Sequence, residues 1–128
     1  MSQENIERIK EAFAARQRGD LDALVDLYDS EAVFETLLLG THRGKEAIRL
    51  LYEENRRTLD GYNVVPVELI EAGDKVVAVA QMAGTGPVSE IALEGRFAFV
   101  FTLREGLIVR ERAFRNRKEA LEAASLSE

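Results

Sequence analysis

The feature that most constrains the fold is a long alternating segment near the C-terminus, Gly95–Asn116. Two strand-like stretches flank the pair Glu105-Gly106. A two-residue hairpin loop needs positive φ angles, which glycine adopts without steric cost. With this pair as the loop, Arg104 faces Leu107 and the pairing continues outward from there. The segment therefore predicts a long β-hairpin, and the rest of the chain is expected to cover it.

This pairing assigns every side chain of the hairpin to a face, because side chains alternate along a strand. A register slip of one residue would exchange the faces. In that alternative register Glu111 is a candidate acid. The face expected to meet the helices carries the large aromatic residues, namely Phe97, Phe99, Phe101, Leu103, Ile108, Arg110, Arg112, Phe114 and Asn116.

Composition excludes several classes of protein. The 128 residues suit a single domain, 1–128, with a core of its own. Cysteine is absent, which removes disulfides and thiolate zinc sites and fits a cytoplasmic location. The net charge of −6 argues against nucleic acid as a partner. No apolar stretch approaches the roughly 20 residues that cross a bilayer, and the polar N-terminus is unlike a secretory signal. We therefore expect a cytoplasmic protein that binds neither membranes nor nucleic acid.

Apolar periodicity predicts the remaining elements. Helices are predicted over 4–18, 21–28 and 45–59, with Asp20 capping the second. Strands are predicted over 32–36, 62–71 and 75–84, and Pro66 predicts an edge position or a bulge. Asn116 is predicted to cap a short helix over 117–124. Such segregated elements favour an α+β fold, a curved, mostly antiparallel sheet wrapped as a cone around the N-terminal helices. The inside of that cone is a natural apolar pocket for a small molecule.

The order of elements and several local sequences resemble the SnoaL-like family, within the cystatin-like cone fold of nuclear transport factor 2. The resemblance covers nearly the whole chain and implies this α+β cone. It is shared by polyketide cyclases, ketosteroid isomerases, hydrolases, dehydratases and non-catalytic binding domains, so it does not select an activity. The residues that carry it are 19–28, 32–35, 44–48, 72–77, 96–109 and 117–123.

The chain departs from the family pattern where polyketide cyclases carry a His-Trp-Asp sequence on the last strand. The resemblance places their histidine at Glu111 and their aspartate at Ala113. Close relatives also tend to have a histidine at the position of Phe99 and an aspartate at the position of Asn116. The cyclase mechanism is therefore not supported in its usual form.

Three residues are candidates for catalysis, each with a structural alternative. His42, the only histidine, is the readiest general base near neutral pH, although a loop-bracing histidine is common. Glu35 would have a raised pKa if it entered the cone, and otherwise lies on the surface. Arg112, placed among phenylalanines, would stabilise an enolate-like oxygen or form a salt bridge to Glu35 or another acid. With one histidine and no cluster of ligands, we expect neither a metal nor a cofactor.

The pocket walls are expected to be mostly aromatic, which core packing explains equally well. One of the candidates, Asn116, is already explained by its predicted capping role. These candidate ligand-binding residues are Phe13, Phe34, Tyr52, Gln81, Phe99, Phe101, Phe114 and Asn116. Tyr28, like Tyr52 and Gln81, could place a hydrogen-bonding group against an apolar cavity, with core packing as the alternative.

The leading hypothesis is a protein with an apolar pocket for a small aromatic or polycyclic molecule. If it is an enzyme, we expect a cofactor-independent isomerase, cyclase or dehydratase that moves a proton on a hydrophobic carbonyl compound. The alternatives are a module that binds a hydrophobic small molecule without catalysis and a dimerisation domain with a filled core. Whether the chain is an enzyme stays open at this point. A homodimer through the outer face of the sheet is expected, because Ala98, Val100, Val109 and Ala113 would otherwise be exposed together.

Overall fold

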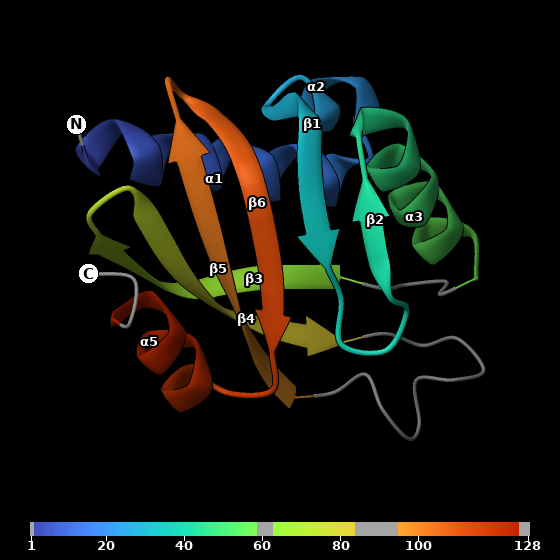
Figure 1. Ribbon diagram of the computed structural model, residues 1–128. Helices are drawn as coiled ribbons and strands as arrows, with labels where there is room; N and C mark the ends of the chain where they lie inside the picture. The colour runs from blue at the N-terminus through green and yellow to red at the C-terminus, as the bar shows by residue number, and fades with distance from the viewer. Residues whose placement is uncertain (1, 59–62, 84–94, 126–128) are drawn as a thin grey trace.

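The computed structural model describes residues 2–58, 63–83 and 95–125, which form one mixed sheet and four helices (Figure 1). The strands run in the order β2-β1-β6-β5-β4-β3. Neighbouring strands are antiparallel except β1 and β6, which are parallel. The helices are α1 (Ser2–Arg18), α2 (Leu21–Val25), α3 (Lys45–Thr58) and α5 (Arg117–Ser125), and the strands are β1 (Tyr28–Glu35), β2 (Thr41–Arg43), β3 (Asn63–Ala72), β4 (Lys75–Ala83), β5 (Gly95–Arg104) and β6 (Leu107–Phe114).

The sheet curls around α1, and this arrangement confirms the predicted α+β cone (Figure 1). The main hydrophobic core lies between the inner face of the sheet and the first three helices, and it includes Ile9, Phe13 and Ile48. A second, smaller core lies on the outer face, where α5 packs Ala120 and Ala124 on β4 and β5. Within the described ranges, no helix is long and apolar enough to cross a membrane.

Local capping signals in the sequence fix the helix ends as predicted. Gly19 adopts a φ of 77°, and the N–H of Asp20 donates to the carbonyl of Ala15 at 2.9 Å, which closes α1. The side chain of Asp20 then accepts from the N–H of Ala23 at 3.1 Å and begins α2. Asn116 likewise accepts from the N–H of Glu119 at 2.9 Å at the start of α5.

Pro66 behaves as expected, whereas two boundaries near the start of the sheet are wrong. Pro66 lies on the edge strand β3, next to a register shift. Thr41–Arg43, expected as a loop, forms the edge strand β2. Tyr28, expected at the end of a helix, begins β1 and pairs with Ile108 of β6. Helical periodicity is overridden there by pairing with a distant strand.

The hairpin has the predicted turn but a different register beyond it. Glu105 and Gly106 have φ angles of 54° and 82°, as a type I′ turn requires. The register then shifts, because Leu103 pairs with Ile108 while Thr102 pairs with Arg110. Val109 is the extra residue of this β-bulge, so the strand faces exchange for the rest of β6.

Beyond the bulge, the predicted assignment of faces on β6 is wrong. Phe101 pairs with Glu111, so Glu111 joins the aromatic inner face. Arg112 pairs instead with Val100 of the outer face. Arg110 and Phe114 move to the outer face with it, and Phe114 packs on the second core. The bulge thus replaces two inward-pointing guanidiniums with one inward-pointing carboxyl.

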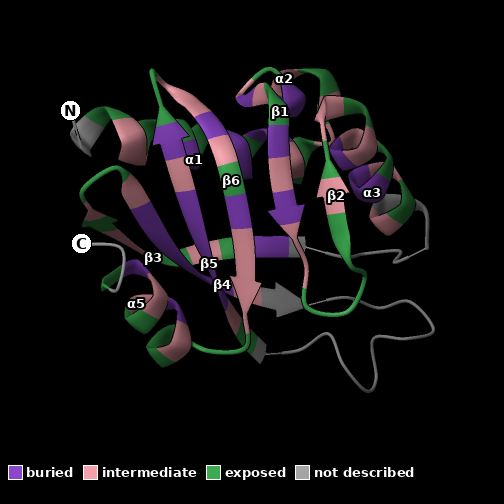
Figure 2. Cartoon of the chain, viewed as in Figure 1, coloured by how far each residue is buried: buried purple, intermediate pink, exposed green. Residues whose placement is uncertain are grey.

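The apolar residues of the outer face are also less exposed than expected. Ala98 and Val100 are 0% and 4% exposed, because α5 of the same chain packs on them. Most of β5 is accordingly coloured as buried in Figure 2. Ala113 packs against the inner core instead. The prediction of a shared apolar patch is therefore wrong, and a homodimer stays a prediction that needs another physical basis.

Candidate active site inside the cone

The inner face of the sheet holds a buried acid, Glu111, which is 1% exposed. Among the residues that the structure describes, it is the one charged side chain that is buried. Its register partners are Phe34 on β1 and Phe101 on β5. Paired residues of neighbouring strands share a face, so the carboxyl lies in a row of aromatic side chains.

Two tyrosine hydroxyls satisfy the Glu111 carboxyl. Tyr28, at the start of β1, donates to Oε1 at 2.5 Å. Tyr52, from α3, lies 3.5 Å from each carboxyl oxygen and 3.3 Å from the Tyr28 hydroxyl. Three polar groups from β1, α3 and β6 thus converge between the helices and the sheet.

Burial dominates the electrostatics of this cluster. It raises the pKa of Glu111 from 4.5 to about 7, although hydrogen bonds from Tyr28 and Tyr52 and the charge of Arg16 oppose the rise. Burial also raises the pKa of Tyr28 well above its usual value, and the nearby Glu111 adds to this effect. Near neutral pH both the protonated and the charged form of the Glu111 carboxyl are therefore populated, while Tyr28 remains a hydrogen-bond donor.

A void of about 10 Å³ borders the cluster, between α1, α2 and the sheet. That volume holds about one water molecule. Arg16 of α1 lines it and places its guanidinium 4.7 Å from the centre of the Tyr52 ring. Beside the buried cluster, the space among the described side chains is therefore about the size of one water molecule.

Five predicted wall residues do meet in the inner core. Phe13 of α1 contacts Phe99 and Phe101 edge-on, with ring centroids 6.5 and 6.2 Å apart. The rings of Phe34 and Tyr52 stack at 6.0 Å. The aromatic periodicity of the sequence thus locates the site, although these rings pack against one another.

The other three predicted wall residues lie elsewhere. Gln81 follows the inward-facing Ala80 on β4, so it points outward and accepts a hydrogen bond from Arg96 at 3.3 Å. Phe114 packs on the outer core. Asn116 is exposed and caps α5. These assignments are corrected for two reasons: strand alternation turns Gln81 outward, and the bulge moves the end of β6.

His42 shares the inner face but lies far from the buried acid. It pairs with Phe34 on the edge strand β2, two strands from Glu111, which is roughly 10 Å at normal strand spacing. Its Nε2 lies 3.0 Å from the carbonyl oxygen of Leu39. The structure therefore gives His42 a loop-bracing contact at the rim of the cone.

Glu35 and Arg112, both proposed for catalysis from the sequence, lie on the outer face and pair with each other. The distance from Arg112 Nε to Glu35 Oε1 is 3.3 Å, and their side chains are 41% and 36% exposed. Arg110 donates to the same oxygen at 3.0 and 2.8 Å. The salt-bridge alternative for Arg112 is therefore the one that the structure contains.

Sequence reasoning considered the hydroxyl of Tyr28 for the cavity but assigned the residue to a helix, and it placed Glu111 inside only in the slipped register. A signal for Tyr28 exists, since Tyr28, Ala32 and Phe34 follow strand alternation and all three are buried. No local signal marks the bulge at Val109 that turns Glu111 inward. Among the residues that the structure describes, no three potential metal ligands lie together.

The model of the SnoaL-like domain family matches residues 9–111, most of the chain and all of the buried cluster. The chain belongs to the SnoaL-like family. A search of curated proteins found no match.

Several solved structures have a fold similar to that of this SnoaL-like chain. A candidate polyketide cyclase from Sinorhizobium meliloti is 25% identical over 84% of this chain and 93% of its own, with a TM-score of 0.74. Bal32a, from a soil-derived mobile gene cassette, is 20% identical over 95% and 96%, with a TM-score of 0.82. TerC, co-crystallised with polyporic acid, is 22% identical over 95% and 98%, with a TM-score of 0.77.

Proposed function

We propose that this SnoaL-like protein catalyses a cofactor-independent proton transfer on a hydrophobic carbonyl compound, in the manner of an isomerase, cyclase or dehydratase. The observation that carries the proposal is Glu111, a buried carboxyl whose pKa is raised to about 7 beside two phenols. A general base works best when its pKa lies near the operating pH. The site differs from the residues first proposed, since Glu111 replaces His42 and Glu35 as the base.

In the proposed reaction, the Glu111 carboxylate removes a proton from a carbon next to the substrate carbonyl. The electron pair of that C–H bond forms a carbon–carbon double bond while the π pair of the carbonyl group moves to its oxygen, which gives an enolate. The protonated Glu111 then returns its proton to another carbon of the enolate system, and a double bond to oxygen forms again. Tyr52 is placed to donate to the enolate oxygen, because its 3.5 Å contacts to Glu111 are weaker than the 2.5 Å bond from Tyr28. The nearby charge of Arg16 favours both anionic states.

The size of the void sets a requirement on this proposal. The void beside Glu111 has room for about one water molecule and not for a carbonyl compound, so a substrate that reaches Glu111 must displace side chains that line this void. Two relatives are compatible with a ligand in such a cone: TerC was crystallised with polyporic acid, and another neighbour is a candidate polyketide cyclase.

A second candidate function is a module without catalysis, either for binding a small molecule or for dimerisation. The observation that favours it is that Glu111, Tyr28 and Tyr52 bond to one another. Among the described residues, no buried side-chain polar atom lacks a partner. A fully bonded cluster can serve to specify the core rather than to react.

Deuterium exchange separates the two functions. The protein is incubated in D2O with a panel of hydrophobic ketones, unsaturated ketones and 1,3-dicarbonyl compounds, and NMR follows deuterium entering next to the carbonyl. We expect exchange of at least one compound to be accelerated, and Glu111→Gln to slow it about 100-fold or more.

The matched control is Glu35→Gln, which removes a glutamate charge from the outer face and is expected to leave the rate unchanged. No acceleration with any compound, or equal rates for wild type and Glu111→Gln, would contradict catalysis. Binding of a panel compound, seen as chemical shift changes without exchange, would support the module that only binds.

A further inference from the structure

One side chain connects the buried Glu111 cluster to the solvent. The void beside the cluster is lined by residues of all three inner helices and of β1, β5 and β6. Among the lining residues that the structure describes, Arg16 of α1 is half-buried, whereas each of the others is at most 4% exposed. Arg16 therefore lies between the void and the solvent, and a ligand that enters this void meets its guanidinium first.

Tyr52 places that guanidinium close to the candidate base. The Cζ atom of Arg16 lies 4.7 Å from the centre of the Tyr52 ring. The hydroxyl at the end of the same ring lies 3.5 Å from both carboxyl oxygens of Glu111. The ring of Tyr52 thus holds a cation at its face and the acid at its hydroxyl, so one small molecule can contact both groups.

Arg16 is also the one cation among the described residues that line the void. Except for Glu111, the other lining residues are aliphatic or aromatic, including Phe13 and Leu24. A guanidinium presents several N–H donors in a rigid fork that matches a carboxylate bidentately. An apolar lining with one cation at its entrance favours a ligand that has an apolar body and one anionic group.

We propose that Arg16 binds the anionic group of the substrate, and that the substrate is a hydrophobic keto acid. The carboxylate of the keto acid pairs with the guanidinium at the entrance, while the carbon next to the ketone extends past Tyr52 to Glu111. Arg16 is thus a specificity-determining residue, and Glu111 keeps the proton transfer. The inference rests on the function proposed above, because it names the substrate class of the same site.

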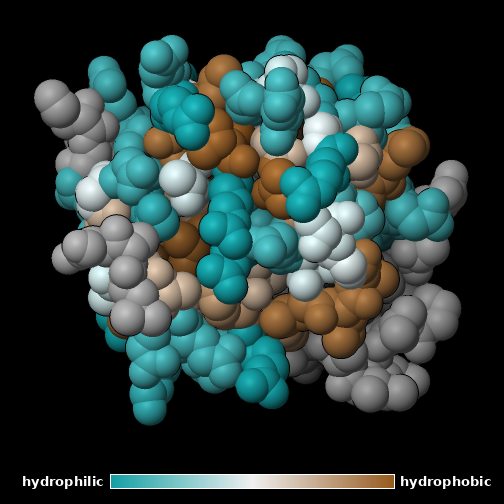
Figure 3. Space-filling view, in the orientation of Figure 1, coloured by the Kyte–Doolittle hydropathy of each residue, from teal (hydrophilic) through white to brown (hydrophobic). Residues whose placement is uncertain are grey.

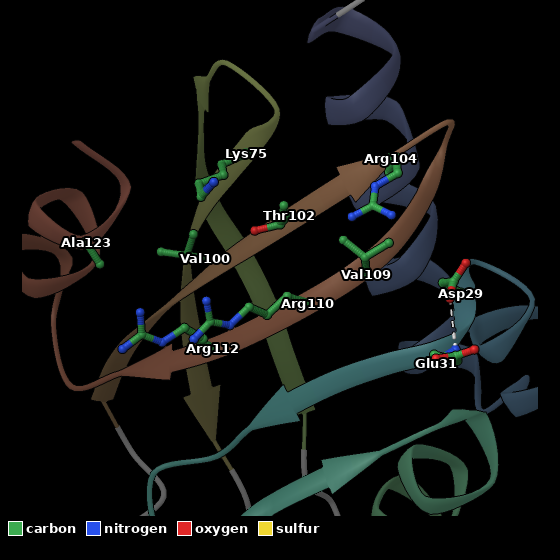
Figure 4. Close-up of a pocket in the computed structure, with 10 residues that line it drawn as sticks. All are labelled: Asp29, Glu31, Lys75, Val100, Thr102, Arg104, Val109, Arg110, Arg112 and Ala123. Atoms are coloured by element: carbon green, nitrogen blue, oxygen red, sulfur yellow. Dashed lines mark hydrogen bonds between the residues drawn. The ribbon is translucent and has the colours of Figure 1, made fainter. Parts of the chain in front are cut away.

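A second group of cations lies on the outer face of the sheet, where an anion cannot present a carbon atom to Glu111. A groove of about 880 Å³ crosses that face (Figure 4), and hydrophilic side chains lie over β6 in the whole-molecule view (Figure 3). Two carboxylates of β1 share the groove and would repel an anion. Its charged lining residues are Asp29, Glu31, Lys75, Arg104, Arg110 and Arg112.

Pairs of ligands that differ in charge test the proposal. Benzoylpropionate and naphthoylpropionate are each compared with their methyl esters, which keep the ketone and the aromatic body, and NMR chemical shift changes measure the affinities. We expect wild type to bind at least one acid about tenfold or more tightly than its ester, because a charge-assisted bidentate pair forms. Arg16→Gln should lose this preference.

The titration of Glu111 shows where the acid binds. The charge of Arg16 opposes the rise in pKa that burial causes at Glu111. A carboxylate that neutralises Arg16 should therefore raise the midpoint of the Glu111 titration further, and the methyl ester should leave it unchanged. An acid that binds in the outer groove would not change this midpoint.

The matched control is Arg18→Gln, which removes the same charge from the same helix. Arg18 is 58% exposed and pairs with Asp20 at 3.5 Å, so this variant should keep the preference for the acid. Arg16→Lys keeps the charge without the fork and should retain only part of the preference. It provides the test if Arg16→Gln fails to fold.

Equal affinities for every acid and its ester would overturn the proposal. A preference that is unchanged in a folded Arg16 variant, or one that is lost in Arg104→Gln of the outer groove, would also overturn it. Deuterium exchange separates this inference from the proposed catalysis. Acids and esters that exchange at equal rates would support the catalysis and overturn the keto acid, whereas an acid that binds at Arg16 without exchange would support the ligand class and contradict the catalysis.

Discussion

Glu111 and Glu35 lie on neighbouring strands, one register step apart, yet on opposite faces of the sheet. Phe34 pairs with Glu111, and the next residue, Glu35, pairs with Arg112. Inside, two phenols hold the carboxyl and burial raises its pKa to about 7. Outside, two guanidiniums and solvent surround the carboxyl. A glutamate side chain is thus a candidate general base on the inner face and part of an ordinary salt bridge on the outer face, because its surroundings differ.

A fixed charge at the position of Glu111 is expected to have the largest effect on this comparison. Glu111→Arg would place a guanidinium, which cannot lose its charge, beside Phe34 and Phe101 on the inner face. An unpaired buried charge costs several kcal/mol, a large part of a typical stability of about 5–15 kcal/mol. We expect a loss of this size in chemical unfolding followed by circular dichroism. Glu35→Gln on the outer face is the control, and a Glu111→Arg variant as stable as wild type would contradict the inner position of this residue.

The second largest effect is expected from Glu111→Gln, which should change how the stability of the fold depends on pH. The folded state keeps the Glu111 proton up to about pH 7, whereas the unfolded chain loses it near pH 4.5. The contribution of this proton to folding stability is therefore complete below pH 4.5. It is lost as the pH rises to 7, and the loss is about 3 kcal/mol for a pKa shift of this size.

The glutamine variant removes this loss. Relative to wild type, Glu111→Gln should gain about 3 kcal/mol in unfolding free energy between pH 4 and pH 8. Urea unfolding at several pH values measures it, and Glu35→Gln should show no such gain. Parallel pH curves for wild type and Glu111→Gln would exclude a raised pKa.

Tyr28→Phe is expected to have an intermediate effect. It removes the 2.5 Å donor to Glu111 and should cost about 1.5–3 kcal/mol above pH 7, where the bond is to a charged group. It should also raise the pKa of Glu111 further, because that bond favours the carboxylate. Tyr52→Phe, with contacts of 3.5 Å, should cost less. Chemical unfolding of both variants tests this order, and a larger loss for Tyr52→Phe would reverse the assigned roles.

Glu35→Gln should have the smallest effect. Its ion pairs with Arg110 and Arg112 are partly exposed, and such pairs contribute about 0–1 kcal/mol. We expect a small loss of stability at low salt that disappears in about 1 M salt, where charges are screened within about 3 Å. A loss above 2 kcal/mol that persists at high salt would mean that the outer pair is buried in the protein as it exists in solution.

Most of the architecture could be predicted from local signals. Asp20 and Asn116 cap helices, Pro66 disturbs an edge strand, and Glu105-Gly106 makes the hairpin turn, because each acts through nearby backbone groups. The short β2 could not be predicted, since three residues carry no periodicity and depend on pairing with β1.

The candidate site was only partly predictable, because it depends on the bulge at Val109. No glycine or proline marks that position. With the bulge, the core buries one carboxyl that can take up a proton. In the unbulged register it would bury two guanidiniums that cannot lose their charge. This difference depends on the whole core, so alternation within the strand does not reveal it.

The most direct test of the account is the titration of Glu111 itself. Carbon-13 NMR of protein labelled at the glutamate carboxyls, with Glu111→Gln to assign the resonance, follows the ionisation of this group from pH 4 to 9. We expect the carboxyl to titrate with a midpoint near pH 7. A midpoint close to 4.5, as for a glutamate in water, would place the carboxyl outside the cone and contradict the central claim.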